Sequence, residues 1–226
     1  MTRVGVAVPA AGSGRRMGGV RKPFLELAGR PVLEHALRPF LADERVVAVV
    51  VALSTADSDD PPAWLTALDP RVGIVEGGQS RGASVARAID ALPHDLDVIA
   101  VHDAARPLVS PETVAACIDV AAAGDGAVAG CPAVDTMKTV DAEGWIDATP
   151  ARARLWHAHT PQVFPADALR RAYASGHEDA TDDAALAEAI GVRVRMIDDG
   201  GVNPKVTRPH DVVVAEALLR ARGDGA

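Results

Sequence analysis

Short runs of apolar residues recur along the chain, and segments whose apolar positions follow a helical spacing separate most of them. The runs have the length of β-strands and are apolar on both faces, which is typical of a parallel sheet covered by helices on both sides. They span residues 4–8, 46–53, 72–75, 98–102, 127–134 and 192–197. The expected helices span residues 32–41, 84–92, 111–122 and 209–221. This alternation predicts an α/β, Rossmann-like, doubly wound fold with a mostly parallel sheet.

The stretch from residue 135 to residue 162 interrupts this alternation, because it contains no clean helix. Residues 139–146 predict a short strand, a glycine-containing turn and a second strand. We therefore expect one domain over residues 1–226, with a protruding β-hairpin arm at about residues 135–155. Such an excursion serves function or a subunit contact, or is a plain surface hairpin. Residues 57–62 are expected to form a polar surface loop.

Composition narrows the class of protein. Of the 226 residues, 48% are apolar and 24% are charged, which indicates a globular domain. No stretch reaches the roughly 18–20 continuous apolar residues that span a bilayer, and no signal peptide is evident, so we expect a cytoplasmic protein without a membrane partner. The net charge of −8 is unfavourable for binding nucleic acid. Cys117 and Cys131 form no CxxC pair, and both are expected to be buried, small apolar residues.

Positive charge gathers at the start of the chain. Residues 1–25 contain five cationic side chains and no acidic residue. Arg15 and Arg16 lie within a glycine-rich segment, residues 9–19, that follows the first predicted strand. The loop after a strand of this kind lies at the carboxyl edge of the sheet, where small residues let backbone N–H groups approach a phosphate. The segment is therefore a candidate anion site, the alternative being a plain tight turn.

The segment matches neither of two common nucleotide-binding motifs. The P-loop pattern G-x-x-x-x-G-K-[ST] is absent. The dinucleotide pattern would need glycine at position 17, where the chain has Met17, and no acidic residue ends the second predicted strand. A dinucleotide oxidoreductase is therefore disfavoured. The sequence also shows no Ser-His-Asp or Cys-His grouping for nucleophilic catalysis, and no His/Cys cluster that would support a zinc site.

Several short motifs, in one order, resemble a family of nucleotidyltransferases. The first is the run from Pro9 to Met17, followed by Lys22. Further along lie LAGRPVL (27–33), VHDAARP (101–107), DTMK (135–138), LWHAHTPQ (155–162), TDD (181–183) and NPKVTRP (203–209). Together they resemble the 2-C-methyl-D-erythritol 4-phosphate cytidylyltransferase family of the non-mevalonate isoprenoid pathway. The resemblance extends over nearly the whole chain.

The resemblance implies an enzyme that joins CTP to 2-C-methyl-D-erythritol 4-phosphate and releases pyrophosphate. The acceptor phosphate is already anionic, so its in-line attack needs cations and positioning rather than a general base. Arg16 and Lys22 would be the catalytic residues at the α-phosphate. Arg21 is an alternative to Lys22, because the chain is about one residue shorter than is usual in the family at this point. Mg²⁺ or another divalent cation is expected mainly on the CTP phosphates, with Asp103 as a possible protein ligand.

The resemblance also implies two sets of binding residues. Those for CTP are Pro9, Ala10, Ala11, Gly12, Ser13, Gly14, Arg15, Gly78, Gln79, Ser84 and Ala104. Those for the polyol phosphate are Asp103, Arg106, Thr136, Arg152, Thr160, Thr181 and Lys205.

The residues alone leave structural alternatives open for several of these positions. Gly78 also fits a strand-to-helix turn, and Arg15 fits a solvated surface arginine. His102 fits a packed histidine, Arg106 an ion pair with Asp103, and Thr181 the start of a helix.

Thr136 and Arg152 lie on the predicted arm. In the family this arm reaches into a neighbouring subunit, so the resemblance implies an obligate homodimer in which both residues serve the partner's site. Three alternative functions remain: a CDP-ribitol (ribitol 5-phosphate) cytidylyltransferase, a sugar-1-phosphate nucleotidyltransferase, and a catalytically weak nucleotide-binding homologue.

Overall fold

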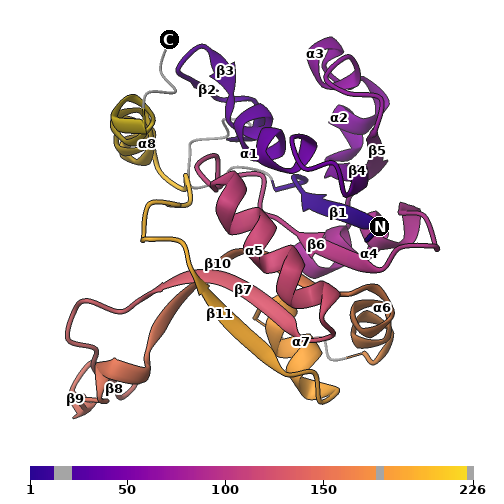
Figure 1. Ribbon diagram of the computed structural model, residues 1–226. Coiled ribbons are helices and arrows are strands. Elements are labelled where there is room, and N and C mark those ends of the chain that lie inside the picture. The colour runs from indigo at the N-terminus through magenta and orange to yellow at the C-terminus, as the bar shows by residue number, and fades with distance from the viewer. Residues whose placement is uncertain (13–21, 177–180, 223–226) are drawn as a thin grey trace.

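The computed structural model describes residues 1–12, 22–176 and 181–222 (Figure 1). Its centre is a seven-stranded sheet in the order β11-β7-β10-β6-β1-β4-β5. β10 is antiparallel to β6 and β7, whereas the other neighbours pair in parallel. The predicted mostly parallel α/β sheet is therefore confirmed. The strands are β1 (Val4–Pro9), β4 (Val46–Leu53), β5 (Val72–Glu76), β6 (Val98–Val101), β7 (Gly126–Pro132), β10 (Trp156–Pro165) and β11 (Val194–Asp198).

Helices cover both faces of this sheet. One buried cluster joins α1 and α5 to the side chains of Val4, Val6 and Val8, and a second joins α4, α6 and α7 to Ala7 and its neighbours. Successive side chains of β1 therefore enter different cores, which explains why its sequence is apolar throughout. The helices are α1 (Val32–Leu41), α2 (Thr55–Asp59), α3 (Ala63–Thr66), α4 (Arg81–Ala91), α5 (Pro111–Ala122), α6 (Ala166–Ala174), α7 (Asp183–Ala189) and α8 (Pro209–Arg222).

Polar side chains fix where four of these helices begin, α2 through Ser54 among them. Ser80, Ser110 and Asp182 each accept a hydrogen bond from a backbone N–H in the first turn, of α4, α5 and α7 respectively. Pro111 occupies the first turn of α5, where its missing N–H costs nothing. These caps place the start of α4 and of α7 at the carboxyl edge of the sheet.

The arm is a two-stranded hairpin of β8 (Thr139–Val140) and β9 (Ile146–Ala148), as predicted. Gly144 takes a φ of 91° in its turn, a conformation that favours glycine. The hairpin extends away from the sheet, and every residue from 134 to 149 is exposed (Figure 1). The smaller elements are η2 (Lys22–Phe24), η3 (Arg152–Arg154) and the strands β2 (Glu26–Leu27) and β3 (Arg30–Pro31).

Three sequence-based expectations need correction. The predicted loop at residues 57–62 begins inside α2, where Asp57 is buried beneath the Ser54 cap. Cys117 is buried as expected, but Cys131 is only partly buried. β10, α6 and α7 were not predicted, and β10 lies in the middle of the sheet. Within the described residues, no helix is both long enough and apolar enough to cross a membrane.

Candidate functional site

The carboxyl ends of β1, β5 and β6 bring the predicted nucleotide-binding segments to one edge of the sheet. The loop after β1 lies directly against the turn after β5: a Cβ placed on Gly77 would be 2.5 Å from the Cβ of Ala11. The backbone N–H of Gly77 also donates to the carbonyl of Leu53 at 2.7 Å. Glycine is needed here because the two loops approach closely.

Asp103 lies just beyond the end of β6, between two cations. Arg81 donates from Nε to Oδ1 at 2.9 Å, and Lys205 donates from Nζ to Oδ2 at 2.6 Å. The carboxylate is almost buried, whereas 41% of the Lys205 side chain is exposed. The ammonium group therefore has further donors that a ligand can reach.

The two cations control the ionisation of Asp103. Burial alone would raise the pKa of this carboxyl group, but the charges of Arg81 and Lys205 outweigh burial and hold the pKa well below its usual range. Asp103 is therefore a carboxylate at any pH at which the protein works. Its charge is matched by neighbours, so it can accept hydrogen bonds from a ligand without needing to change its protonation state.

A second carboxylate, Asp183, shares Arg81. Its side chain is fully buried at the start of α7, and Arg81 donates to it from Nη2 at 2.8 Å. The hydroxyl of Tyr173 donates to the other oxygen of Asp183. Burial would lower the pKa of Arg81, but Asp183 and Asp103 raise it further than burial lowers it. One guanidinium thus connects α4, the end of β6 and the start of α7.

A chain of hydrogen bonds fixes the backbone of Asp103. Its N–H donates to Thr160 Oγ1 at 3.0 Å, and that hydroxyl lies 3.1 Å from His102 Nδ1. The other ring nitrogen of His102 lies 3.0 Å from the carbonyl of Arg106, which can only accept. His102 therefore donates through Nε2 and accepts through Nδ1 from Thr160. Complete burial lowers the pKa of His102 to about 4, so the ring is neutral and packed rather than a ligand.

Arg106 is buried beside this chain and connects it to the C-terminal segment. It donates to the carbonyl of Asn203 at 2.7 Å, and burial lowers its pKa. The predicted alternative, an ion pair with Asp103, is replaced by the pairs that Asp103 makes with Arg81 and Lys205. No described residue accepts from the buried Nε of Arg106.

The turn between β5 and α4 is held by Ser84. Its hydroxyl accepts from the N–H of Gly78 at 3.1 Å and lies 2.9 Å from the carbonyl of Ser80. A Cβ on Gly78 would be 2.4 Å from the Cβ of Ala83, so the turn closes tightly onto the helix. Gln79 is exposed at its tip. Gly78 does lie in a strand-to-helix turn, as its structural alternative predicts, and its role in CTP binding stays a prediction.

The structure brings part of the predicted site together. At the carboxyl edge it gathers Pro9, Ala10, Ala11, Gly12, Gly78, Gln79, Ser84, Asp103, Ala104, Arg106, Thr160 and Lys205. Thr181 is exposed beside Asp182, the N-cap of α7. Outside the described residues lie Ser13, Gly14, Arg15, Arg16 and Arg21, together with the side chain of Lys22.

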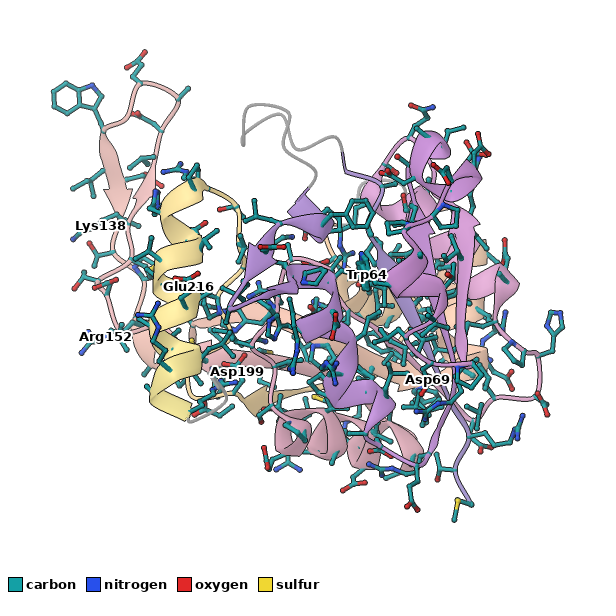
Figure 2. The ribbon with its side chains drawn as sticks, turned by 90° about the horizontal axis from the view of Figure 1, so that it is seen from above. Trp64, Asp69, Lys138, Arg152, Asp199 and Glu216 are labelled. Carbon is teal, nitrogen blue, oxygen red and sulfur yellow. The ribbon has the colours of Figure 1, made fainter. Side chains whose placement is uncertain are left out.

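Two predicted substrate residues are not brought to this edge by their own chain. Thr136 and Arg152 are exposed on the arm and at its root, and Arg152 donates to the carbonyl of Val134 within the arm. Figure 2 shows Lys138 and Arg152 at the margin of the molecule, beyond the helix that carries Glu216. A contact of Thr136 or Arg152 with a substrate at this edge would need a second subunit.

Sequence reasoning missed Arg81 and Asp183 as parts of the site. Asp183 ends the TDD segment and Arg81 lies close to Gln79, but no spacing rule connects two residues that are 102 positions apart. It also predicted no His/Cys cluster, yet the fold brings Cys131, His159 and Asp199 together, with one candidate ligand atom from each within 4.8 Å of the others. The insertion of β10 beside β7 causes this, and β10 was not predicted.

Comparison with known proteins identifies the family of this chain. The model of the family IspD, 2-C-methyl-D-erythritol 4-phosphate cytidylyltransferase, matches residues 4–221. A relative of that name from Frankia casuarinae is 44% identical over 230 residues, which cover 99% of this chain and 84% of the relative. Another, from Symbiobacterium thermophilum, is 42% identical over 220 residues, covering 96% and 92%.

Solved structures give the same result. The 4-diphosphocytidyl-2C-methyl-D-erythritol synthase of Anaerococcus prevotii superposes with a TM-score of 0.86 at 25% identity, over 97% of this chain and 96% of that one. The 2-C-methyl-D-erythritol 4-phosphate cytidylyltransferase of Thermus thermophilus superposes with a TM-score of 0.78 at 33% identity, over 95% and 98%. Because the family model, the relatives and the solved structures all match over nearly its whole length, this chain belongs to the 2-C-methyl-D-erythritol 4-phosphate cytidylyltransferase family.

Proposed function

We propose that this protein transfers the cytidylyl group of CTP to 2-C-methyl-D-erythritol 4-phosphate, forming CDP-methylerythritol and pyrophosphate for isoprenoid precursor synthesis. The observation that carries the proposal is Asp103, held between Arg81 and Lys205 beside the loop after β1. Family membership supports the same reaction.

The reaction needs two anions to be brought together. Lys205 is exposed enough to bind the acceptor phosphate or a polyol hydroxyl, and Asp103 accepts from a hydroxyl group with its remaining lone pairs. Arg106 adds a buried positive charge next to them. The phosphate of the acceptor then attacks the α-phosphorus in line, and pyrophosphate leaves. Arg16 and Lys22, or Arg21 in place of Lys22, would stabilise the charge that develops at the α-phosphate.

The metal ion is part of the nucleotide substrate in this proposal. Mg²⁺ binds through phosphate oxygens and few carboxylates. Both oxygens of Asp103 already accept from cations, so this carboxylate has little uncompensated charge to offer a metal. Mg²⁺ would therefore be held mainly by the CTP phosphates, and Asp103 would contribute at most one bond.

The arm supplies the remaining contacts from a second subunit. Val140, Trp145 and Ile146 expose 56%, 73% and 63% of their surface on the hairpin, an apolar area that water solvates poorly. A two-stranded hairpin is also marginal on its own. We propose a homodimer that covers this area and brings Thr136 and Arg152 into the partner's site.

A panel assay of pyrophosphate release tests the function. The protein is given CTP, UTP or ATP with methylerythritol phosphate, ribitol 5-phosphate or a sugar 1-phosphate. The proposal expects the highest kcat/KM with CTP and methylerythritol phosphate. A higher value with ribitol 5-phosphate or a sugar 1-phosphate would assign the protein to one of those activities, and no release with any pair would make it a non-catalytic homologue.

A further inference from the structure

Cys131, His159 and Asp199 form a cluster on three neighbouring strands, and none of the three belongs to the group formed by Asp103, Arg81 and Lys205. Cys131 lies near the end of β7, His159 lies in β10, and Asp199 directly follows β11. The register between β10 and β7 shifts between Ala158 and Gln162, which releases His159 from the ladder. The N–H of Asp199 donates to the carbonyl of Gly130 at 2.9 Å, which holds the carboxylate over the end of β7.

The spacing of the donor atoms fits a tetrahedral metal ion. The sulfur of Cys131, a ring nitrogen of His159 and a carboxylate oxygen of Asp199 lie within 4.8 Å of one another. Ligands of tetrahedral zinc are about 3.3–3.8 Å apart, as follows from bond lengths of about 2.0–2.3 Å. His159 Nδ1 and Asp199 Oδ2 are 2.7 Å apart, so small side-chain movements would bring all three to that spacing.

The charges of the cluster suit a dication. A thiolate and a carboxylate with a neutral imidazole carry two negative charges, and sulfur and nitrogen donors select zinc over magnesium. The side chains of His159 and Asp199 are only 13% and 2% exposed, so water shields them little.

A polar group beside the cluster also lacks a partner. Asn203 donates from Nδ2 to Asp199 Oδ2 at 3.2 Å and to the carbonyl of Thr160 at 2.9 Å. Its Oδ1 is buried and accepts from none of the described residues. A buried amide oxygen without a donor is costly, and a water molecule bound to a metal ion is a strong donor. Asn203 therefore supplies the second sign of a ligand at this place.

We propose that Cys131, His159 and Asp199 bind a Zn²⁺ ion, with a water molecule as the fourth ligand. Cys131 precedes the arm and His159 follows it, so the ion would fasten both roots of the arm to the segment after β11. That segment carries Asn203, whose carbonyl binds Arg106, and continues to Lys205. The ion is thus a structural connection between the arm and the substrate side of the edge. The inference does not depend on the reaction proposed above.

Titration of the full-length, nucleotide-free and metal-free protein with Co²⁺ tests the site. We expect one equivalent to produce a thiolate-to-metal charge-transfer band and the visible absorption of tetrahedral cobalt, and one equivalent of Zn²⁺ to abolish both. Cys131→Ser should lose the charge-transfer band and weaken binding by more than the roughly 10–100-fold that changes around a metal's ligands produce. Asp199→Asn should weaken binding as well.

Matched controls separate this site from others. Cys117→Ala removes the other cysteine, which is fully buried in the core, and His157→Gln changes an exposed histidine on the same strand. Both should keep the band and the affinity, and circular dichroism should show every variant folded. The proposal is overturned if the wild type gives no charge-transfer band. A band retained in Cys131→Ser or lost in Cys117→Ala overturns it too, as does loss of binding in His157→Gln alone.

Discussion

Asp103 and Asp183 share one arginine, and this sharing sets the properties of both carboxylates. Arg81 reaches them with different nitrogens, Nε for Asp103 and Nη2 for Asp183. The planar guanidinium can do this because its donors point in fixed, divergent directions, which a single ammonium group does not reproduce. The side chain of Arg81 is therefore both a structural connection and the element that orients Asp103.

Arg81→Lys should destabilise the fold and impair substrate binding together. The ammonium group cannot bridge both acids, so one buried carboxylate loses its ion pair with residue 81, at a cost of about 3 kcal/mol. We expect urea unfolding to show this loss, and KM for the polyol phosphate to rise. Arg38→Lys, which alters an exposed pair with Glu34 on α1, should change stability by no more than about 0.5 kcal/mol. Equal effects of both changes would refute the bridging role.

His102 should make stability depend on pH. Burial lowers its pKa from 6.5 to about 4. Between these pH values His102 is therefore protonated in the unfolded chain and neutral in the folded protein. The contribution of the neutral His102 to the free energy of unfolding is therefore complete above pH 6.5 and is lost as the pH falls towards 4. Between about pH 7 and pH 5 the loss is on the order of 2 kcal/mol. Urea unfolding at pH 7 and at pH 5 measures this loss. In His102→Asn the free energy of unfolding should fall by about 2 kcal/mol less between the two pH values than in the wild type, whereas in His94→Asn, a change at an exposed position, it should fall as in the wild type.

At the scale of elements, the sequence predicts those strands and helices whose burial leaves a clear apolar pattern. The strands with continuous apolar runs, such as β4, and the long amphipathic helices, such as α1 and α5, match their expected bounds. β10 was missed because its first three residues, Trp156 to Ala158, are exposed and His159 is only partly buried, while the half from Thr160 onward enters the core. Its sequence therefore shows neither an apolar run nor a clean alternation.

The site was predictable to the extent that its residues lie in local motifs. Asp103, Thr160 and Lys205 were identified because each belongs to a quoted segment. The Arg81 bridge and the cluster around Asp199 were not, because both depend on which strands become neighbours, and β10 had not been placed. The position of the arm's residues relative to the edge is likewise a property of the assembly rather than of local sequence.

The contact between the loop after β1 and the turn after β5 can be tested with glycine substitutions. A Cβ at Gly77 would lie 2.5 Å from Ala11 Cβ and 3.1 Å from the carbonyl of Leu53, so Gly77→Ala must push the loops apart. We expect a loss of about 10–100-fold in kcat/KM for CTP, since displacements of about 1 Å have such effects. Gly82→Ala is the control, because its nearest neighbour, Ser80 Oγ, is 4.0 Å away. A normal rate for Gly77→Ala would show that this contact is unimportant.

At the scale of the whole molecule, the arm is the feature that a single chain does not explain. It is exposed along its length and its apolar side chains face solvent, yet it keeps a regular turn in which Asp141 accepts from two backbone N–H groups. Arg152 and Lys205, both predicted to bind the polyol phosphate, lie on separate parts of one chain. A symmetric dimer would cover the apolar side chains of the arm. It would also bring Arg152 to Lys205, if each arm completes the site of the other subunit.

Mixing two inactive variants tests this exchange. Arg152→Ala and Lys205→Met should each impair activity on their own. In a mixed dimer, one site receives Lys205 from one subunit and Arg152 from the other, so an equal mixture should recover about a quarter of the wild-type rate. The rate is measured after partial denaturation and joint refolding, with each variant refolded alone as the control. No recovery above those controls would show that both residues act within one chain.

The most direct test of the proposed reaction is to follow the phosphorus atoms themselves. With CTP, Mg²⁺ and methylerythritol phosphate, ³¹P NMR of the wild-type protein should show a diphosphate diester and pyrophosphate growing in equal amounts as both substrates decline. Lys205→Met should slow this by about 10²–10³, because it removes a cation from the reacting anions. The account is contradicted if the wild type forms no diester, or if Lys205→Met forms it at the wild-type rate.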